Sequence, residues 1–152
     1  MLKLFVYLMV IVLSISCNSN NADNKTPQQN NASIPKSISD SLYQTVMQGH
    51  DSAMIKTGEV IRYQQVLKKQ RDSLTMLKGN HKNRLTGINA VLDSLQNAQD
   101  LMNKWMNAFD PEKAGATEAE KQLYFQKEKE KVETVKSLIL HSIERAKEIT
   151  GH

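Results

Sequence analysis

The chain has 152 residues, of which 24% are charged and 5% aromatic, with a formal net charge of +4 and a single cysteine. This length suffices for one domain and not comfortably for two, and one cysteine excludes a fold held together by internal disulfides. Acidic and basic residues alternate, as in the Lys-Glu-Lys-Glu-Lys run at 127–131. That alternation is typical of a solvated helix face and argues against nucleic acid as a partner.

The first seventeen residues have the pattern of a lipoprotein signal peptide. Lys3 gives a charged start, an apolar run covers residues 4–13, and small uncharged residues lead into Cys17. The apolar run is too short for a permanent transmembrane helix, which needs about 20 residues. The segment resembles bacterial lipoproteins, although Leu13 lies four residues before the cysteine instead of three, as in the looser pattern of Bacteroidota. We therefore predict a signal peptide at residues 1–16 and lipidation of Cys17.

Lipidation would also explain why an exported chain carries one unpaired cysteine. The acyl chains would bury dozens of methylene groups at about 0.8 kcal/mol each, so attachment would be effectively permanent. The alternatives are an uncleaved anchor or a secretory peptide that is cut elsewhere. Residues 18–20 carry no acidic sorting signal. The predicted location is therefore the cell envelope, on the inner or outer membrane, facing the periplasm or the cell surface.

A polar tether is predicted at residues 17–36, beginning with the lipidated cysteine. The stretch is rich in Asn, with Gln, Ser and Pro, and contains almost nothing to bury, which is typical of disorder. Its eighteen residues 18–35, if flexible, have an end-to-end distance of about 25 Å. The tether would thus hold a helical domain, residues 37–152, near its membrane without fixing its orientation.

The first predicted helix begins at Ser37 or Ser39, either of which can cap it, and ends near Lys78 before a Gly-Asn-His-Lys-Asn turn. Its apolar positions recur mostly every seven residues, the spacing of a helix that packs lengthwise on another. Gly49 and Gly58 each weaken the helix by about 1 kcal/mol relative to Ala, and we expect a bend near Gly49. The expected buried positions are Leu42, Val46, Ala53, Val60, Tyr63, Leu67, Leu74 and Leu77.

Two further predicted helices have apolar positions that alternate at spacings of three and four. The second ends at the Asp-Pro pair at 110–111, because proline disfavours helical geometry in the residue before it. The third begins at the capping-box sequence Thr-Glu-Ala-Glu at 117–120 and ends at Gly151. The expected buried positions are Leu85, Ile88, Leu92, Leu95, Gln99, Met102, Met106 and Phe109 in the second helix, and Phe125, Glu128, Val132, Val135, Ile139, Ser142, Ala146 and Ile149 in the third.

Together these helices predict an all-α fold, an elongated antiparallel three-helix bundle of coiled-coil type. At 1.5 Å per residue the helices would be about 60, 40 and 50 Å long. Short connections make sequence neighbours antiparallel. We expect the start of the first, longest helix to overhang the bundle, where a bend, a second copy or a partner would cover it.

A cluster of His, Met and Trp residues is the sharpest candidate for a chemical site. His50 and Met54 share a helix face. A pivot at the first loop would place Met54 beside Phe109 and Met106 beside Thr57, so the groups at 47–54 and 102–106 could meet at one end of the bundle. Thioethers and imidazole suit copper(I), although Met at an apolar position is also ordinary core filling. The ligand set of this alternative is Met47, His50, Met54, Met102, Trp105 and Met106.

No catalytic residue is predicted. His50 and Asp51 form a minimal acid–base pair, but adjacent helix residues point in different directions and no nucleophile is placed to act with them. A narrow bundle also offers little room for the concave cavity that an active site needs. We therefore expect no enzymatic activity and no cofactor, copper being the alternative.

Two short patterns carry a resemblance to a known group of proteins. They are H-D-x-x-M-x-K-x-x-E at 50–59 and A-x-x-x-M-x-x-W-M at 98–106. They resemble small helical lipoproteins of Bacteroidota, which are often labelled after viral A-type inclusion proteins. The resemblance covers residues 42–149 and implies a helical domain on a lipid tether. It implies no known activity, so it transfers no catalytic or binding role to any residue.

These observations predict a membrane-anchored, non-enzymatic helical binding or scaffold lipoprotein. Its partners would be the membrane, through the lipid on Cys17, and a protein or a second copy of the chain on its helix faces. The alternative is a periplasmic copper-binding protein that uses the His/Met/Trp cluster.

Overall fold

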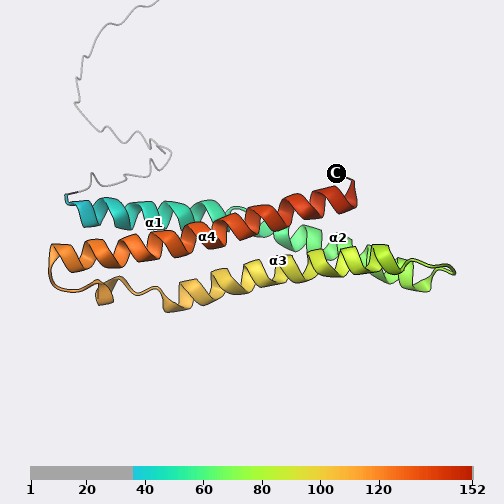
Figure 1. Ribbon diagram of the computed structural model, residues 1–152. Coiled ribbons are helices and arrows are strands. Elements are labelled where there is room, and N and C mark those ends of the chain that lie inside the picture. The colour runs from blue at the N-terminus through green and yellow to red at the C-terminus, as the bar shows by residue number, and fades with distance from the viewer. Residues whose placement is uncertain (1–35, 152) are drawn as a thin grey trace, which may run out of the picture. The chain divides into compact units, whose positions relative to one another are not determined.

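The computed structural model describes residues 36–151, so the predicted signal peptide, Cys17 and nearly all of the tether lie outside the described residues. The all-α prediction is confirmed: the described residues form helices and no strands. No described helix is both long enough and apolar enough to span a membrane. The elements are α1 (Ile38–Met54), α2 (Thr57–Met76), α3 (Lys82–Ala108), the short 3₁₀ helix η1 (Pro111–Ala114) and α4 (Glu118–Thr150) (Figure 1).

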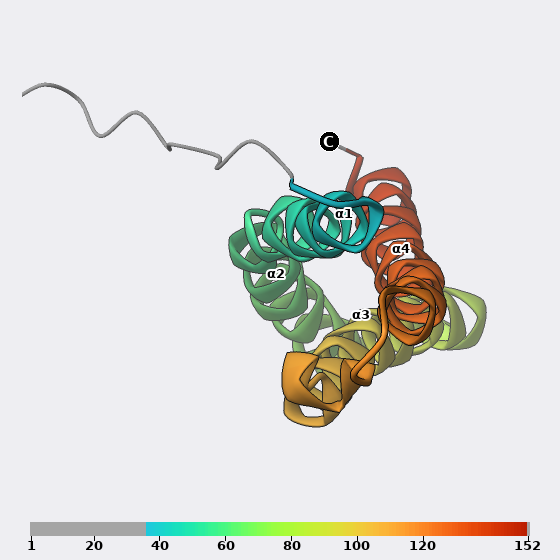
Figure 2. The same cartoon turned by 90° about the vertical axis from the view of Figure 1, so that its left-hand side faces the viewer.

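The helices form the predicted three-helix bundle, with α1 and α2 together making up one of its three members (Figure 2). Ser39 near the start of α1 contacts Glu118 at the start of α4, so these two helices run in the same direction. Trp105 near the end of α3 contacts Glu128, in the first half of α4, so α3 is antiparallel to α4. The short connections therefore produce the up-down-up arrangement that the sequence predicted.

The first member of the bundle bends at Ile55 and Lys56, six residues beyond Gly49, near which the bend had been expected. The Lys56 N–H donates to the carbonyl oxygen of Ala53 at 3.0 Å, a tightened turn that separates α1 from α2. Gly49 is instead buried inside α1, where an added Cβ would lie 3.0 Å from Val132 Cγ1. Gly49 thus permits close packing of α1 on α4.

One hydrophobic core runs along the bundle and uses most of the predicted positions. Several predicted positions near the ends are only half-buried, and Leu77 is 59% exposed because it lies in the loop after α2. The prediction that Leu77 is buried is therefore wrong. The core residues are Val46, Ala53, Val60, Tyr63, Leu67, Ile88, Val91, Leu92, Leu95, Ala98, Met102, Trp105, Val132, Val135, Ile139, Ile143 and Ala146.

The predicted capping residues lie at the helix termini as expected, Ser37 and Thr117 at helix starts and Gly151 at a helix end. The Ser37 side chain accepts a hydrogen bond from the Asp40 N–H at the start of α1. Thr117 and Glu120 form a complete capping box before α4, which satisfies backbone N–H groups that lack partners within the helix. Gly151 closes α4 in the left-handed conformation at φ 76°, which a glycine adopts without strain.

The overhang lies at the opposite end from the one predicted. The first turns of α4 extend past the end of α3 and cover the start of α1. At the other end an added Cβ on Gly87 would lie 3.2 Å from Ile149, so α4 ends beside Gly87 of α3. The end of α2, the loop and the start of α3 project beyond α4 without a third helix (Figure 1). We call residues 68–86 the tip.

Candidate functional site

Three of the six predicted metal ligands come together between α1 and α3. His50 Nε2 lies 3.3 Å from the sulfur of Met106. The His50 and Trp105 rings are 5.7 Å apart between centroids. The other ring nitrogen, Nδ1, lies 2.9 Å from a carboxylate oxygen of Asp51. A hydrogen bond from Nδ1–H to Asp51 would orient the ring with the Nε2 lone pair toward the sulfur.

Met54 and Met102 lie together at another place, one turn away on their helices. Both line a small cavity of about 30 Å³ beside the interruption between α1 and α2. The Thr57 hydroxyl lies 3.9 Å from the Met54 sulfur. Met102 is buried in the core, whereas Met54 is exposed and Met47, one turn before His50, is half-buried. The structure therefore divides the six predicted ligands instead of gathering them at one point.

The helix pairing differs from the predicted one, and this explains the division. Met106 was expected beside Thr57 and lies beside His50, seven residues or two helical turns earlier. In the adjoining hairpin, Gln64 of α2 donates to Gln96 of α3 at 3.3 Å, which is about one turn from the predicted pairing. The remaining offset arises at the interruption, because α1 and α2 are not one continuous helix.

An aromatic cluster adjoins the His50–Met106 pair through Trp105, toward the end of the bundle where α1 and α4 begin. Trp105 stacks on Phe109 with 4.9 Å between ring centroids. Tyr43 makes an edge contact with Phe125 at 5.4 Å. The apolar pattern of the sequence predicted that Phe109 and Phe125 are buried, but it did not predict that the aromatic rings form one cluster. The signal was present, because the aromatic residues of three helices fall at helix ends that the topology brings together. The cluster consists of Tyr43, Trp105, Phe109, Tyr124 and Phe125.

Glu128 is a buried carboxylate that fixes the position of Trp105. It is 6% exposed and accepts a hydrogen bond from Trp105 Nε1–H at 3.0 Å. Lys131, one turn later, donates to its second oxygen at 2.7 Å. A buried charge is tolerated when it is paired and hydrogen-bonded in this way. Glu128 had been predicted only as a buried position, and its pairing with the indole is a finding of the tertiary structure.

A second carboxylate joins the start of α1 to the start of α4. Glu118 accepts hydrogen bonds from the backbone N–H of Ser39 at 2.9 Å and from its hydroxyl at 2.8 Å. Gln122 donates to the same carboxylate. The hydrogen bond from Gln122, followed by those from Ser39, lowers the pKa of Glu118 to about 2. The carboxylate is thus charged at neutral pH, when it can accept all three bonds.

The His50 pair brings together an imidazole nitrogen and a thioether sulfur. Within residues 36–151, no group of three or more His, Cys, Asp or Glu side chains is arranged to hold a metal ion. The imidazole of His50 and the thioether of Met106 are a different donor set, and two such donors suit copper(I). Comparison of the chain with protein-family models, with curated proteins and with solved structures found no match.

Proposed function

We propose that this protein is a lipid-anchored, non-enzymatic helical binding or scaffold module of the bacterial cell envelope. The observation that carries the proposal is the joint where the predicted tether reaches the bundle. Ser37 caps α1 at that joint, and Ser39 binds Glu118 through two hydrogen bonds. A domain held by a tether at one end needs a firm attachment there.

The contacts at this joint suit a tethered domain mechanically. A force on the chain before Lys36 would act first on the start of α1, a helix of 17 residues. The Ser39–Glu118 contact passes that force to α4, whose 33 residues run alongside both α1 and α2. The bundle would then move as one body and keep its helix faces available to a partner.

Lipidation is tested in cells by metabolic labelling with an alkyne fatty acid, followed by membrane fractionation. We expect the wild-type chain to carry the label and to sediment with membranes, and Cys17→Ser to lose both properties. Asn18→Gln, which leaves the cysteine in place, is the matched control. Label on Cys17→Ser would contradict the proposal, and so would an unlabelled wild-type chain. Photo-crosslinkers at exposed helix positions would then identify the partner.

A soft-metal function is the second candidate, supported by the 3.3 Å approach of His50 Nε2 to the Met106 sulfur. It is tested by copper(I) titration of the chain from residue 17 with Cys17→Ser, because a free thiol would itself bind copper. Trp105, the chain's single tryptophan, reports binding through its fluorescence. Saturable quenching that His50→Ala and Met106→Leu abolish would establish the site. Met54→Leu is the control, because Met54 lines a small cavity away from the His50–Met106 pair and the change conserves volume.

A further inference from the structure

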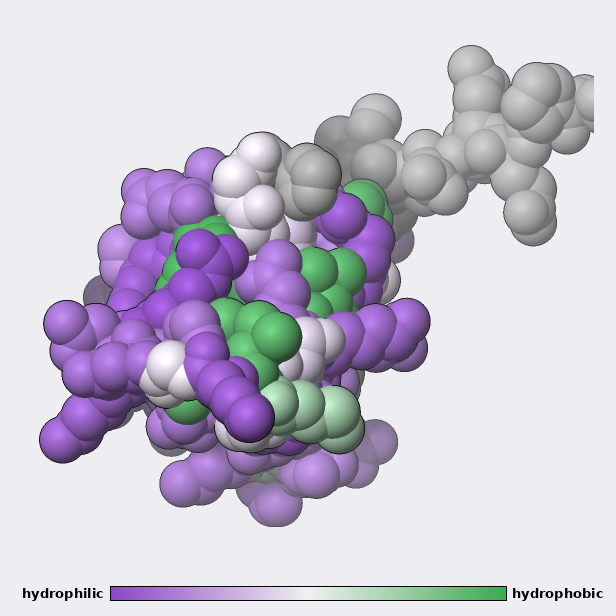
Figure 3. Space-filling model, turned by 90° about the vertical axis from the view of Figure 1, so that its right-hand side faces the viewer, coloured by the Kyte–Doolittle hydropathy of each residue, from purple (hydrophilic) through white to green (hydrophobic). Residues whose placement is uncertain are grey.

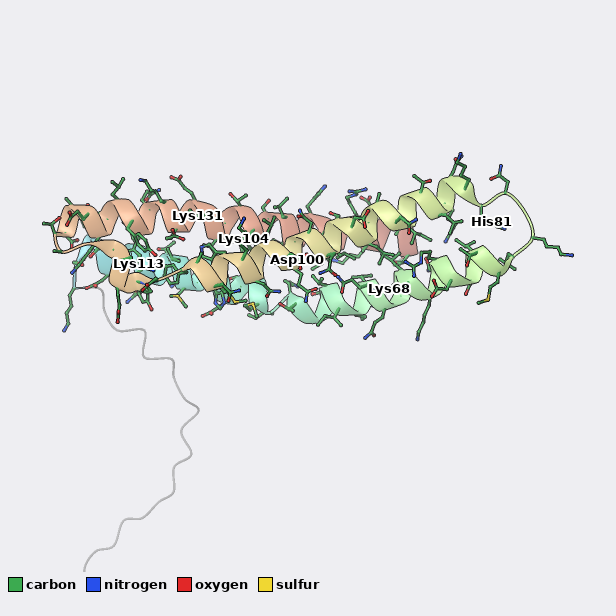
Figure 4. The ribbon with its side chains drawn as sticks, turned by 90° about the horizontal axis from the view of Figure 1, so that it is seen from below. Lys68, His81, Asp100, Lys104, Lys113 and Lys131 are labelled. Atoms are coloured by element: carbon green, nitrogen blue, oxygen red, sulfur yellow. The ribbon has the colours of Figure 1, made fainter. Side chains whose placement is uncertain are left out.

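The tip, residues 68–86, is the part of the bundle that lacks a third helix. Gly87 lies beside Ile149, two residues before the cap of α4 at Gly151, so residues before Gly87 have little of α4 to pack on. Figure 4 shows this end, with Lys68 on α2 and His81 in the loop between α2 and α3. An uncovered pair of helices presents to solvent a surface that a third helix covers elsewhere in the bundle.

The net positive charge of the tip is larger than that of the whole chain. Six of its residues are Lys or Arg and one is Asp, a net charge of +5, whereas the full chain has +4. Within the tip only Arg71 forms an ion pair, with Asp72 at 2.9 Å. The other five cations are exposed and form no ion pair in the described residues: Lys68, Lys69, Lys78, Lys82 and Arg84.

Apolar side chains stand at the apex among these cations. Met76, the last residue of α2, is 84% exposed, more than any other large apolar side chain that the structure describes. Leu77, the next residue, is 59% exposed. Figure 3 looks onto this end of the bundle and shows apolar surface bordered by hydrophilic side chains. Exposed apolar residues within a basic border are typical of surfaces that bind a partner or a membrane.

A hollow on the flank of the tip has the chemistry of an anion site. Its volume is about 420 Å³, and it is lined by Lys69, Gln70, Ser73, Leu74 and Arg84. The two cations, the amide and the hydroxyl can each donate hydrogen bonds to phosphate oxygens, and Leu74 supplies an apolar wall. Lys69 comes from α2 and Arg84 from α3, so the hollow forms only when the hairpin folds.

We propose that the tip binds the surface of an anionic phospholipid membrane. The lysines and arginines would contact lipid phosphates, with one headgroup in the hollow beside Lys69 and Arg84. Met76 and Leu77 would enter the boundary between headgroups and acyl chains. Charge argues against a second copy as the occupant, because two tips of +5 repel each other. The proposal does not require lipidation of Cys17, since the tip would bind without it.

The described chain begins at Lys36, at the opposite end of the bundle from the tip (Figure 1). The 27 residues of α3 alone span about 40 Å at 1.5 Å per residue. A tether and a tip that held the same membrane would therefore place the long axis of the bundle along the membrane surface.

The test measures vesicle binding by the chain from residue 17 with Cys17→Ser, which removes the predicted anchor and retains every core residue. We expect cosedimentation with vesicles of phosphatidylglycerol and phosphatidylcholine, and none with phosphatidylcholine alone. Raising the salt from about 0.15 M to about 1 M shortens the Debye length from about 8 to about 3 Å and should weaken binding strongly. Equal binding to neutral and anionic vesicles, or none to either, would overturn the proposal.

A charge-matched pair of variants locates the surface. Each Lys or Arg near an anionic membrane contributes about fivefold to partitioning, so the variant Lys69→Gln/Arg84→Gln should bind about 25-fold more weakly. The control Lys104→Gln/Lys127→Gln removes two exposed cations from other parts of the bundle and should bind much more strongly than the tip variant. Equal losses in the two variants would mean that net charge, and not the tip, governs binding.

The apolar apex is tested separately. The variant Met76→Ser/Leu77→Ser changes two exposed residues, so it should fold as the wild type does. It should lower the binding that persists at high salt, because apolar insertion is not screened by ions. Unchanged high-salt binding in this variant would show that Met76 and Leu77 do not contact the membrane. Thermal unfolding of every variant, followed by circular dichroism, shows that the losses do not come from unfolding.

Discussion

The two ends of this bundle are built differently. At the end where α1 and α4 begin, five aromatic rings pack together and Trp105 donates to buried Glu128. At the tip, Met76 and Leu77 are exposed, and two buried side-chain atoms, Gln70 Oε1 and His81 Nε2, have no hydrogen-bond partner. In the described part of the chain, no other buried side-chain nitrogen or oxygen lacks a hydrogen-bond partner, and both of these atoms belong to the tip.

The packed end therefore serves mainly to stabilise the fold, and the tip leaves side chains free to contact another molecule. A packed and hydrogen-bonded end contributes to the free energy of unfolding, whereas an end with exposed apolar residues and unpaired cations retains interactions for something outside the chain. The tip is also expected to open locally at lower free-energy cost, because few buried contacts hold it. Substitutions at the two ends should therefore have unequal effects on stability.

The largest effect is expected from Trp105→Ala. The indole is 7% exposed, and its loss would leave a cavity and remove the donor to buried Glu128. We expect a loss of about 3–5 kcal/mol in the free energy of unfolding. Urea denaturation followed by circular dichroism measures it, with Met76→Ala at the tip as the control. If the two variants unfold at the same urea concentration, the comparison between the ends is wrong.

A smaller effect should follow from Trp105→Phe, which keeps a large ring and removes the Nε1–H donor. Glu128 would retain the hydrogen bond from Lys131 but would lose its partner on α3. We expect a loss of about 1–3 kcal/mol. The variant Trp105→Phe/Glu128→Gln tests the assignment, because a neutral side chain costs less to leave unpaired. A double variant no more stable than Trp105→Phe would argue against the charge as the cause.

Two glycines offer a matched comparison between α1 and α2. An added Cβ at Gly49 would lie 3.0 Å from Val132 Cγ1, whereas at Gly58 nothing lies within 4 Å. We expect Gly49→Ala to destabilise by about 1–3 kcal/mol through overpacking. Gly58→Ala should stabilise by about 0.4–1 kcal/mol, because it restricts the unfolded chain. Thermal melts of both variants check the signs, and the same sign in both would refute the close packing of α1 on α4.

The smallest effect concerns pH. Hydrogen bonds from Gln122 and Ser39 lower the pKa of Glu118 from 4.5 to about 2. A carboxyl whose pKa is lower in the folded state stabilises fully above the unfolded value, and the contribution is lost as pH falls from about 4.5 through about 2. We expect Glu118→Gln to flatten the fall in melting temperature over this interval. Ser39→Ala removes the hydrogen bond from the hydroxyl and keeps the one from the backbone N–H, so it should flatten the fall partly. Parallel profiles for wild type and Glu118→Gln would contradict this assignment.

Local patterns predicted the helices well because they depend on short-range chemistry. The caps at Ser37 and Thr117, the stop at the Asp-Pro pair and the glycine at the end of α4 all act within one turn of the residues concerned. The alternating apolar positions likewise predicted which faces are buried. The bend was predicted at the wrong position because a glycine in a helix can either weaken the backbone or let a neighbouring helix approach closely. The sequence alone did not show which of these two roles Gly49 has.

The candidate site was predicted only in part for a related reason. His50 and Trp105 meet in the structure, but through a helix pairing that differs from the predicted one. Met54 and Met106 were not brought to one point, since an offset of two turns in helix pairing separates residues by about 11 Å along a helix. Small local changes, such as the tightened turn at Lys56, produce offsets of this size, and a periodic sequence pattern carries little information about them.

The sequence by itself determined the helical class, the buried face of each helix and the positions of the caps, because these follow from residue type and spacing. Only the tertiary structure decided which helix ends meet. It placed Glu118 beside Ser39, enclosed Glu128 with Trp105 and left the basic tip without α4. Helix length and loop geometry set these outcomes jointly. A shift of one turn moves every contact along a bundle while leaving the apolar pattern of each helix unchanged.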